Sequence, residues 1–193
     1  MIPLVCVIVI GATIGGFFYW RENVRLTPPE EWSMAEYSKP SDFTVTETAK
    51  QKIIENKSAG LIFAIPKDWI ASSTQYSLKL SSPEAKEKNG VFMEKGCRII
   101  TEIVEINTNL SILENELKTG VWGKHITQQD RTVINNKDAL SYIARSETLG
   151  FYHAGIMISY QGKVYSVILN TIPKDSDICL QDFENIKNSI KIQ

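Results

Sequence analysis

Residues 126–171 decide the fold, and they read ITQQDRTVINNKDALSYIARSETLGFYHAGIMISYQGKVYSVILNT. Their β-branched and aromatic side chains alternate with polar ones, which is typical of half-buried strands. The alternation predicts four strands, at residues 126–134, 138–145, 152–160 and 163–171. Short turns at Asn135-Asn136, Leu149-Gly150 and Gln161-Gly162 separate them. Since a parallel pair needs a long crossover, these turns predict an antiparallel meander.

Three strands and a helix are predicted before this meander. In residues 76–80 (YSLKL) apolar and polar side chains alternate, which indicates a half-buried strand. Residues 61–65 (LIFAI) form an apolar run that Pro66 ends, which indicates a buried strand. The β-branched run 97–106 (CRIITEIVEI) is long enough for a central strand. Residues 109–119 change to a helical period, and Gly120 follows as a C-terminal cap.

The chain ends in a predicted amphipathic helix. Its apolar stripe consists of Cys179, Phe183, Ile186 and Ile190. We expect Asp175 or Ser176 to accept hydrogen bonds from the first-turn amides. The stripe has to cover an apolar surface, and the meander offers one. The predicted fold class is therefore α+β, with a single central antiparallel β-sheet and helices packed on its faces.

The N-terminal segment predicts a membrane anchor. Residues 2–20 (IPLVCVIVIGATIGGFFYW) carry no charge, and as a helix they would span about 28 Å, close to the hydrocarbon thickness of a bilayer. Bulky aromatics occupy the place where a signal peptide has small residues, so we expect an uncleaved transmembrane helix. The predicted division is an anchor at 1–20, a stalk containing Pro and Glu at 21–45, and a globular domain at 46–193.

The predicted location is a membrane, with a single pass through the bilayer at residues 2–20. Arg21 and Arg25 follow the anchor, and the positive-inside rule would then keep the domain in the cytoplasm. Long domains translocate largely regardless of flanking charge, and we expect this one to lie outside the cytoplasm.

Two motifs of the domain resemble those of a known family. Residues 63–69 (FAIPKDW) are similar to the phenylalanine, proline and tryptophan signature that opens the PsbP-like domains. Residues 183–192 (FENIKNSIKI) resemble the final helix of bacterial members. The resemblance covers roughly residues 46–193. It implies an α/β/α sandwich around an antiparallel sheet, and it implies little about function, because this fold hosts unrelated partners.

No motif of the sequence indicates catalysis. His125 and His153 are the only histidines, and they lack the spacing of a zinc site. Trp69, Tyr76 and Trp122 are candidate pocket aromatics, although Trp69 is better explained as a core wedge at the Pro66 turn. With 21 basic and 22 acidic residues, the chain also lacks the excess positive charge of a nucleic-acid binder. We expect no catalytic, cofactor-binding or metal-binding residues.

Two functions stay open on this basis. The first is a membrane-tethered, non-catalytic binding or accessory module with an unknown protein partner. The alternative is an unrecognised membrane-anchored hydrolase or small-ligand carrier that uses a pocket of the domain. A pocket that joins His125 or His153 to an acidic residue would favour the alternative.

Cys97 and Cys179 are the only cysteines of the predicted domain. A disulfide between them would close a long loop and would persist only in an oxidising compartment. The other state is a pair of buried free thiols, which the place of Cys179 on the apolar stripe also suits. The sequence leaves both states open, since it does not give the Cα separation that a bridge requires.

Overall fold

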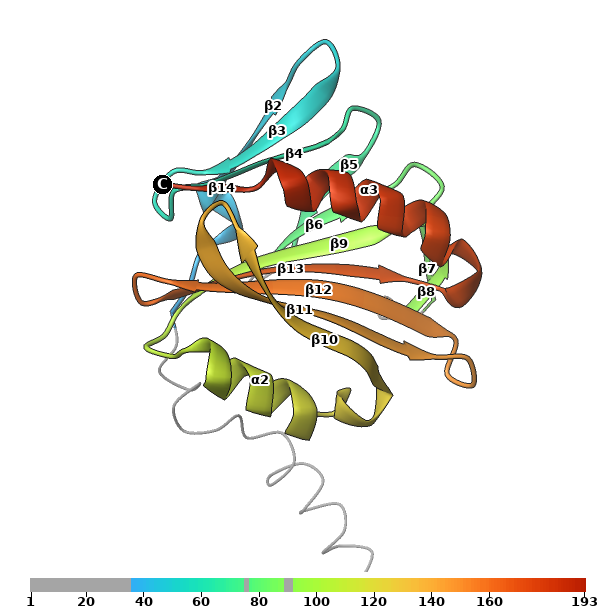
Figure 1. Cartoon of the computed structure of the whole chain (residues 1–193). Coiled ribbons are helices and arrows are strands. Elements are labelled where there is room, and N and C mark those ends of the chain that lie inside the picture. The colour runs from blue at the N-terminus through green and yellow to red at the C-terminus, as the bar shows by residue number, and fades with distance from the viewer. Residues whose placement is uncertain (1–35, 75–76, 89–91) are drawn as a thin grey trace, which may run out of the picture. The chain divides into compact units, whose positions relative to one another are not determined.

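The structure is a computed structural model, and it describes residues 36–74, 77–88 and 92–193. Its main element is an eight-stranded antiparallel sheet (Figure 1), with strand order β10-β11-β12-β13-β9-β6-β5 and with β1 paired to β9. These strands are β1 (Glu36–Tyr37), β5 (Ile70–Ser73), β6 (Leu78–Ser81), β9 (Arg98–Glu105), β10 (Ile126–Ile134), β11 (Lys137–Ser146), β12 (Phe151–Tyr160) and β13 (Lys163–Thr171). The predicted meander is confirmed as β10–β13.

Two of the meander turns owe their shape to left-handed backbone. Asn135 and Asn136 have φ of 49° and 60°, and Gln161 and Gly162 have φ of 48° and 72°. Two consecutive positive φ values define the type I′ turn, whose twist matches that of the strands it joins. The turns predicted at these positions are therefore confirmed, and they fix the register of the hairpins.

The remaining strands form two smaller sheets. One has four strands in the order β14-β4-β3-β2, and the other is the hairpin β7–β8. Their strands are β2 (Phe43–Glu47), β3 (Gln51–Asn56), β4 (Leu61–Pro66), β7 (Lys86–Lys88), β8 (Phe92–Lys95) and β14 (Lys191–Ile192). The predicted central antiparallel sheet is therefore confirmed, but the expectation that it is the single sheet of the domain is wrong. The last residues of the chain pair with β4, a long-range contact that sequence periodicity does not encode.

The two predicted helices are α2 (Leu110–Thr119) and α3 (Ser176–Ser189), and short 3₁₀ turns lie at η2 (Pro40–Asp42), η3 (Gly123–His125) and η4 (Pro173–Asp175). Asn109 caps α2 by accepting hydrogen bonds from two first-turn amides. The capping predicted for α3 is wrong. The Asp175 carboxylate accepts a hydrogen bond from the backbone N–H of Gly96 instead, and the Ser176 hydroxyl donates to the Pro173 carbonyl.

The helices lie on opposite faces of the central sheet (Figure 1). Leu117 of α2 packs with Tyr142, Ala144 and Phe151, and we name that side of the sheet the α2 face. The predicted stripe of α3 is buried in the main core against the other side, which we name the α3 face. The core of the α3 face includes Ile54 and Phe63 of the four-stranded sheet, so this layer is thick and closed.

The folded unit begins before the predicted boundary at residue 46. The contacts of the chain separate residues 1–35 from a compact unit at 36–193. Within that unit, Glu36 and Tyr37 pair with Glu105 and Val104 of β9, so the end of the predicted stalk belongs to the sheet. The predicted anchor at residues 2–20 lies outside the described residues. Among the residues that are described, no helix is long and apolar enough to span a bilayer.

Candidate binding surface

Four aromatic rings gather on the α2 face where β12 begins. The ring of Trp122 lies 4.8 Å from that of Phe151 and 4.9 Å from that of His153, measured between centroids. The Phe151 ring lies 4.8 Å from His153 and 5.3 Å from His125. Most of these pairs meet edge to face, the arrangement that ring quadrupoles favour. We name these four residues the aromatic cluster.

Two glycines place Trp122 in this cluster. A Cβ atom added to Gly123 would lie 1.9 Å from the carbonyl oxygen of Lys118, and one added to Gly120 would lie 2.8 Å from that of Glu116. Only residues without a side chain allow the chain to turn this tightly at the end of α2. The turn directs η3 back onto β11 and β12, which brings Trp122 over Phe151.

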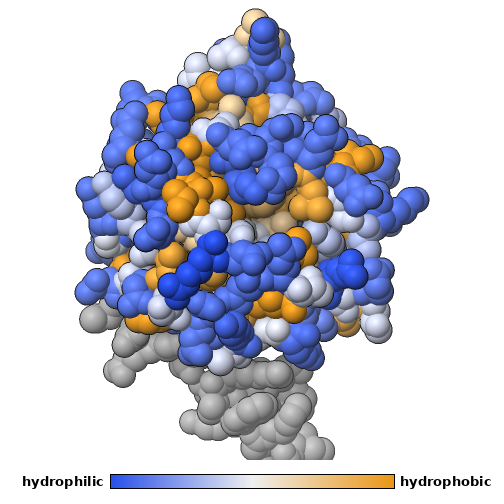
Figure 2. All heavy atoms as spheres, viewed as in Figure 1, coloured by the Kyte–Doolittle hydropathy of each residue, from blue (hydrophilic) through white to orange (hydrophobic). Residues whose placement is uncertain are grey.

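Large apolar side chains at or near the cluster residues in the sequence are exposed. Phe151 is buried, whereas Trp122 is 36% exposed, Val121 is 73% exposed and Leu149 is 57% exposed. Leu149 lies in the β11–β12 turn, two residues before Phe151. We name Val121, Trp122 and Leu149 the apolar edge. Figure 2 shows hydrophobic residues reaching the surface in several separate areas between hydrophilic ones.

The structure brings both histidines to one ring, Phe151, although they lie 28 positions apart in the chain. Burial, and next the positive charge of Arg98, lower the pKa of His153 to about 4. His153 is therefore neutral at pH 7 and behaves as part of an apolar cluster. The signal for this cluster in the sequence is the pair Gly120 and Gly123 around Trp122, of which Gly120 was predicted only as a helix cap.

Among the described acids, Glu102 and Asp182 have a raised pKa, and Glu102 is the one on the same face of the sheet as this histidine. Burial raises the pKa of Glu102 on β9. The register places Glu102 two strands across and four residues along from His153. At usual strand spacings this corresponds to roughly 16 Å between Cα atoms. The described residues therefore do not pair His153 with Glu102 for acid–base catalysis, which requires hydrogen-bond reach.

Cys97 and Cys179 form a disulfide in the structure, with their Cα atoms 5.5 Å apart. Both are buried. The bridge joins the start of β9 to the first turns of α3. Thr171 donates a hydrogen bond to the Gly96 carbonyl beside it, and the Asp175 carboxylate accepts from the Gly96 N–H. The bridge therefore belongs to a buried structural joint between the helix and the sheet.

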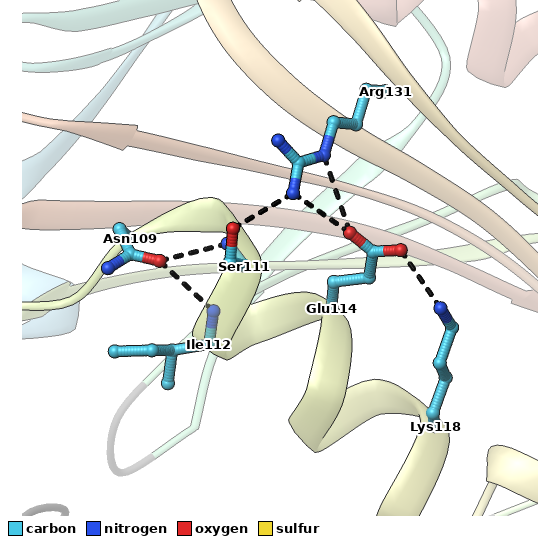
Figure 3. Close-up of polar contacts among 6 residues, drawn as sticks. All are labelled: Asn109, Ser111, Ile112, Glu114, Lys118 and Arg131. Atoms are coloured by element: carbon cyan, nitrogen blue, oxygen red, sulfur yellow. Dashed lines mark hydrogen bonds and ion pairs between the residues drawn. The ribbon is translucent and has the colours of Figure 1, made fainter.

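A polar cluster ties α2 to the edge strand β10 (Figure 3). Arg131 donates hydrogen bonds to the Ser111 hydroxyl at 2.9 Å and to the Glu114 carboxylate at 3.0 Å. Lys118 donates to the other oxygen of Glu114 at 2.9 Å. The hydrogen bonds from Lys118 and then Arg131 lower the pKa of Glu114. The charges of this cluster are paired with one another, so we interpret it as a structural contact that holds α2 against β10.

Two open hollows lie beside α3, and neither is lined by a histidine. One holds about 430 Å³ between the helix and strands β10–β12, and its lining includes Gln128, Ser141, Leu180 and Phe183. The other holds about 500 Å³ between the helix and β4. Across residues 36–74, 77–88 and 92–193, no three His, Cys, Asp or Glu side chains are grouped as a metal site would require.

The other predicted aromatics do not join the apolar edge. Trp69 is buried in the main core, and its backbone N–H donates to the Pro66 carbonyl at 3.2 Å. The prediction that Trp69 wedges this turn against the core is confirmed. Tyr76 lies outside the described residues. Trp122 is thus the member of the predicted set that reaches the surface of the aromatic cluster.

Comparison with known proteins identifies the fold. No protein-family model matches the sequence, and no curated protein matches it. The solution structure of cyanobacterial PsbP (CyanoP) from Synechocystis sp. PCC 6803 is similar to this chain, with a TM-score of 0.57 and 12% identity over 77% of this chain and 95% of that one. LpqN, described as involved in cell envelope biogenesis of Mycobacterium tuberculosis, gives a TM-score of 0.48 and 13% identity over 83% of this chain and 92% of its own.

The likeness to CyanoP shows the fold. This chain has a PsbP-like fold, as the resemblance of its two sequence motifs implies. At 12% identity, this likeness shows the fold and does not show the activity. The activity has to be inferred from the surface of the domain.

Proposed function

We propose that this protein is a membrane-tethered, extracytoplasmic binding module without catalytic activity, and that the apolar edge contacts its protein partner. The observation that carries this proposal is the exposure of Val121, Trp122 and Leu149 around a rigid aromatic cluster. Exposed apolar groups on loops fixed by a scaffold are typical of interaction sites, and aromatic anchors contribute much of their affinity.

The proposed tether is the uncharged run at residues 2–20, which is long enough for one membrane span. The proposed compartment is supported by the buried Cys97–Cys179 bridge, because such disulfides persist in oxidising surroundings. The alternative of a hydrolase or carrier gains no support from the described residues, since His153 contacts aromatic rings and lies far from Glu102.

Copurification tests the binding role directly. The 193-residue chain would be isolated from membranes in detergent, as wild type and as the double variant Val121→Asp/Leu149→Asp. The matched control is Ile178→Asp, since Ile178 is 71% exposed but belongs to α3. We expect one stoichiometric partner with the wild type and the control, and its loss with the double variant. The same partner with all three proteins, or no partner with the wild type, would contradict the proposal.

Labelling of a cysteine introduced at an exposed position tests on which side of the membrane the domain lies. Ile178→Cys would be introduced together with Cys6→Ala, which leaves the reporter as the accessible thiol. A membrane-impermeant maleimide should label this cysteine in intact cells. Labelling only after lysis would place the domain in the cytoplasm. Alkylation in denaturant, with and without reductant, reports separately on whether Cys97 and Cys179 are bridged.

A further inference from the structure

Four polar side chains on the α2 face lack a hydrogen-bond partner in the described part of the chain. They are Glu102 on β9, Gln129 on β10, Tyr142 on β11 and Ser166 on β13, and we name them the unpaired polar set. Both polar atoms of the Gln129 amide are buried without a partner. Tyr142 is 7% exposed and Ser166 is 8% exposed, and neither hydroxyl makes a hydrogen bond there.

The strand register brings Glu102, Tyr142 and Ser166 to one area, whereas Gln129 lies on the edge strand β10, four strands from Glu102. Tyr142 is opposite Gly155, and Ser166 is opposite Glu102. A Cβ atom added to Gly155 would lie 2.3–2.7 Å from the outer ring atoms and hydroxyl of Tyr142. The phenol therefore lies across β12, with its hydroxyl directed away from β11 and toward β13 and β9. The absence of a side chain at Gly155 is what permits this position.

Apolar groups surround the unpaired polar set. Leu117 and Met157 pack against Tyr142 on the side of α2. Ile100 and Ile168 lie beside Glu102 on the same face, and both are only half-buried. At the other end, β8 lies against β13, and Glu87 of β7 pairs with Arg98 at 3.4 Å. The set is thus bordered by two elements of the fold while its centre stays accessible.

Such an arrangement leaves hydrogen-bonding atoms available to a ligand. Tyr142 and Ser166 are more than nine-tenths buried, and their hydroxyl oxygens reach the surface without a hydrogen-bond partner among the described residues. Glu102 adds a carboxylate with no cation within ion-pair distance in the described ranges, and burial raises its pKa. Its charge, after the effect of burial, also raises the pKa of Tyr142, which agrees with the two groups being close.

The chemistry of the set selects the kind of ligand. Its one charged group is an anion, and each of the other three members has an oxygen that can accept a hydrogen bond. A cation with several N–H donors can satisfy Glu102, Tyr142 and Ser166 together, and a charge-assisted hydrogen bond to a carboxylate is among the strong ones. The half-buried isoleucines suit an aliphatic stem next to the charge.

We propose that Glu102, Tyr142 and Ser166 of the unpaired polar set bind an alkylguanidinium or alkylammonium group, with the Glu102 carboxylate pairing its charge and the Tyr142 and Ser166 hydroxyls accepting its N–H groups. This inference deepens the proposed function. It rests on that function in one respect, because it assumes that a basic side chain of the protein partner carries the cationic group. The same chemistry could come from a free basic metabolite, so the experiment includes both forms.

The test is a methyl NMR titration of the 193-residue chain in detergent micelles. The methyl groups of Ile100, Ile168 and Met157 report on the site, and that of Ile178 is the control. The probes are N-acetylarginine amide and a leucine-flanked arginine peptide, compared with N-acetylcitrulline amide, which has the same shape without the charge. We expect saturable shifts at the three reporters, at least tenfold weaker binding of the citrulline probe, and loss of binding in Glu102→Gln.

The outcomes separate this inference from the proposed function. No saturable shift, equal binding of arginine and citrulline, or unchanged binding in Glu102→Gln would overturn the site. Tighter binding of the peptide supports a polypeptide source, and equal binding of both arginine probes supports a small-molecule source of the same cation. If arginine binds while copurification yields no partner, the proposed function fails and the cation site stands. If a partner copurifies and arginine does not bind, only the site fails.

Discussion

The two faces of the central sheet differ in how completely the side chains of the same strands are buried. On the α3 face, Ile99 and Leu169 are completely buried against a core that the disulfide and Phe183 complete. On the α2 face, the neighbouring residues Ile100 and Ile168 are only half-buried. Polar groups without partners lie beside these two isoleucines. The comparison indicates that the α3 face is closely packed, while the α2 face is less completely covered.

Removal of the disulfide should have the largest effect on stability. The bridge joins residues 82 positions apart, and closing a loop of that length stabilises the fold by about 4–5 kcal/mol in the chain-entropy model. The free energy of unfolding of the double variant Cys97→Ser/Cys179→Ser should therefore be lower than that of the wild type by most of this amount, as measured by urea denaturation. A loss below about 1 kcal/mol would mean that the α3 face does not depend on the bridge.

Substitutions at two adjacent positions compare the packing of the two faces, because both truncate an aliphatic side chain of the same size to alanine. Leu169→Ala removes a fully buried side chain from the α3 face and should cost about 3 kcal/mol, including the cavity it leaves. Ile168→Ala removes a half-buried side chain of the same size and should cost about 1 kcal/mol. Urea denaturation of both variants measures the difference. Equal losses would show that the α2 face is as closely packed as the α3 face.

His153 should make the stability depend on pH. Its folded pKa of about 4 lies below the unfolded value near 6.5, so between these values the unfolded chain binds more protons. The free energy of unfolding should therefore fall as the pH drops from 6.5 to 4, by about 2 kcal/mol after allowance for partial exposure. His153→Gln should flatten that part of the profile, measured by urea denaturation at several pH values. An unchanged slope in the variant would exclude His153 as its source.

Sequence patterns predicted the parts of this molecule that depend on local periodicity. The alternation in β10–β13, the Asn135-Asn136 turn and the apolar stripe of α3 all follow from neighbouring residues. The second sheet was missed because the β14–β4 pairing joins residues more than 120 positions apart. The aromatic cluster was missed for a similar reason, since Trp122 meets His153 only after η3 turns back onto the sheet.

The charge cluster of Arg131 and Glu114 likewise depends on tertiary placement. The two residues are 17 positions apart, on an edge strand and a helix, and nothing in their local sequence marks them as partners. The unpaired polar set is harder still to predict, because its members come from four strands and are defined by the partners they lack. Gly155 is the one signal in the sequence, as a glycine inside a strand marks a close approach of another group.

Site-specific photocrosslinking in intact cells tests the central claim most directly. A benzoylphenylalanine would replace Leu149 in the apolar edge or, as the matched control, Ile178 on α3, two exposed apolar positions outside strands. The account predicts one defined crosslinked partner from position 149, none from position 178, and loss of the crosslink when Val121→Asp is added. Crosslinks of equal yield from both positions, or from position 178 alone, would contradict the assignment of function to the α2 face.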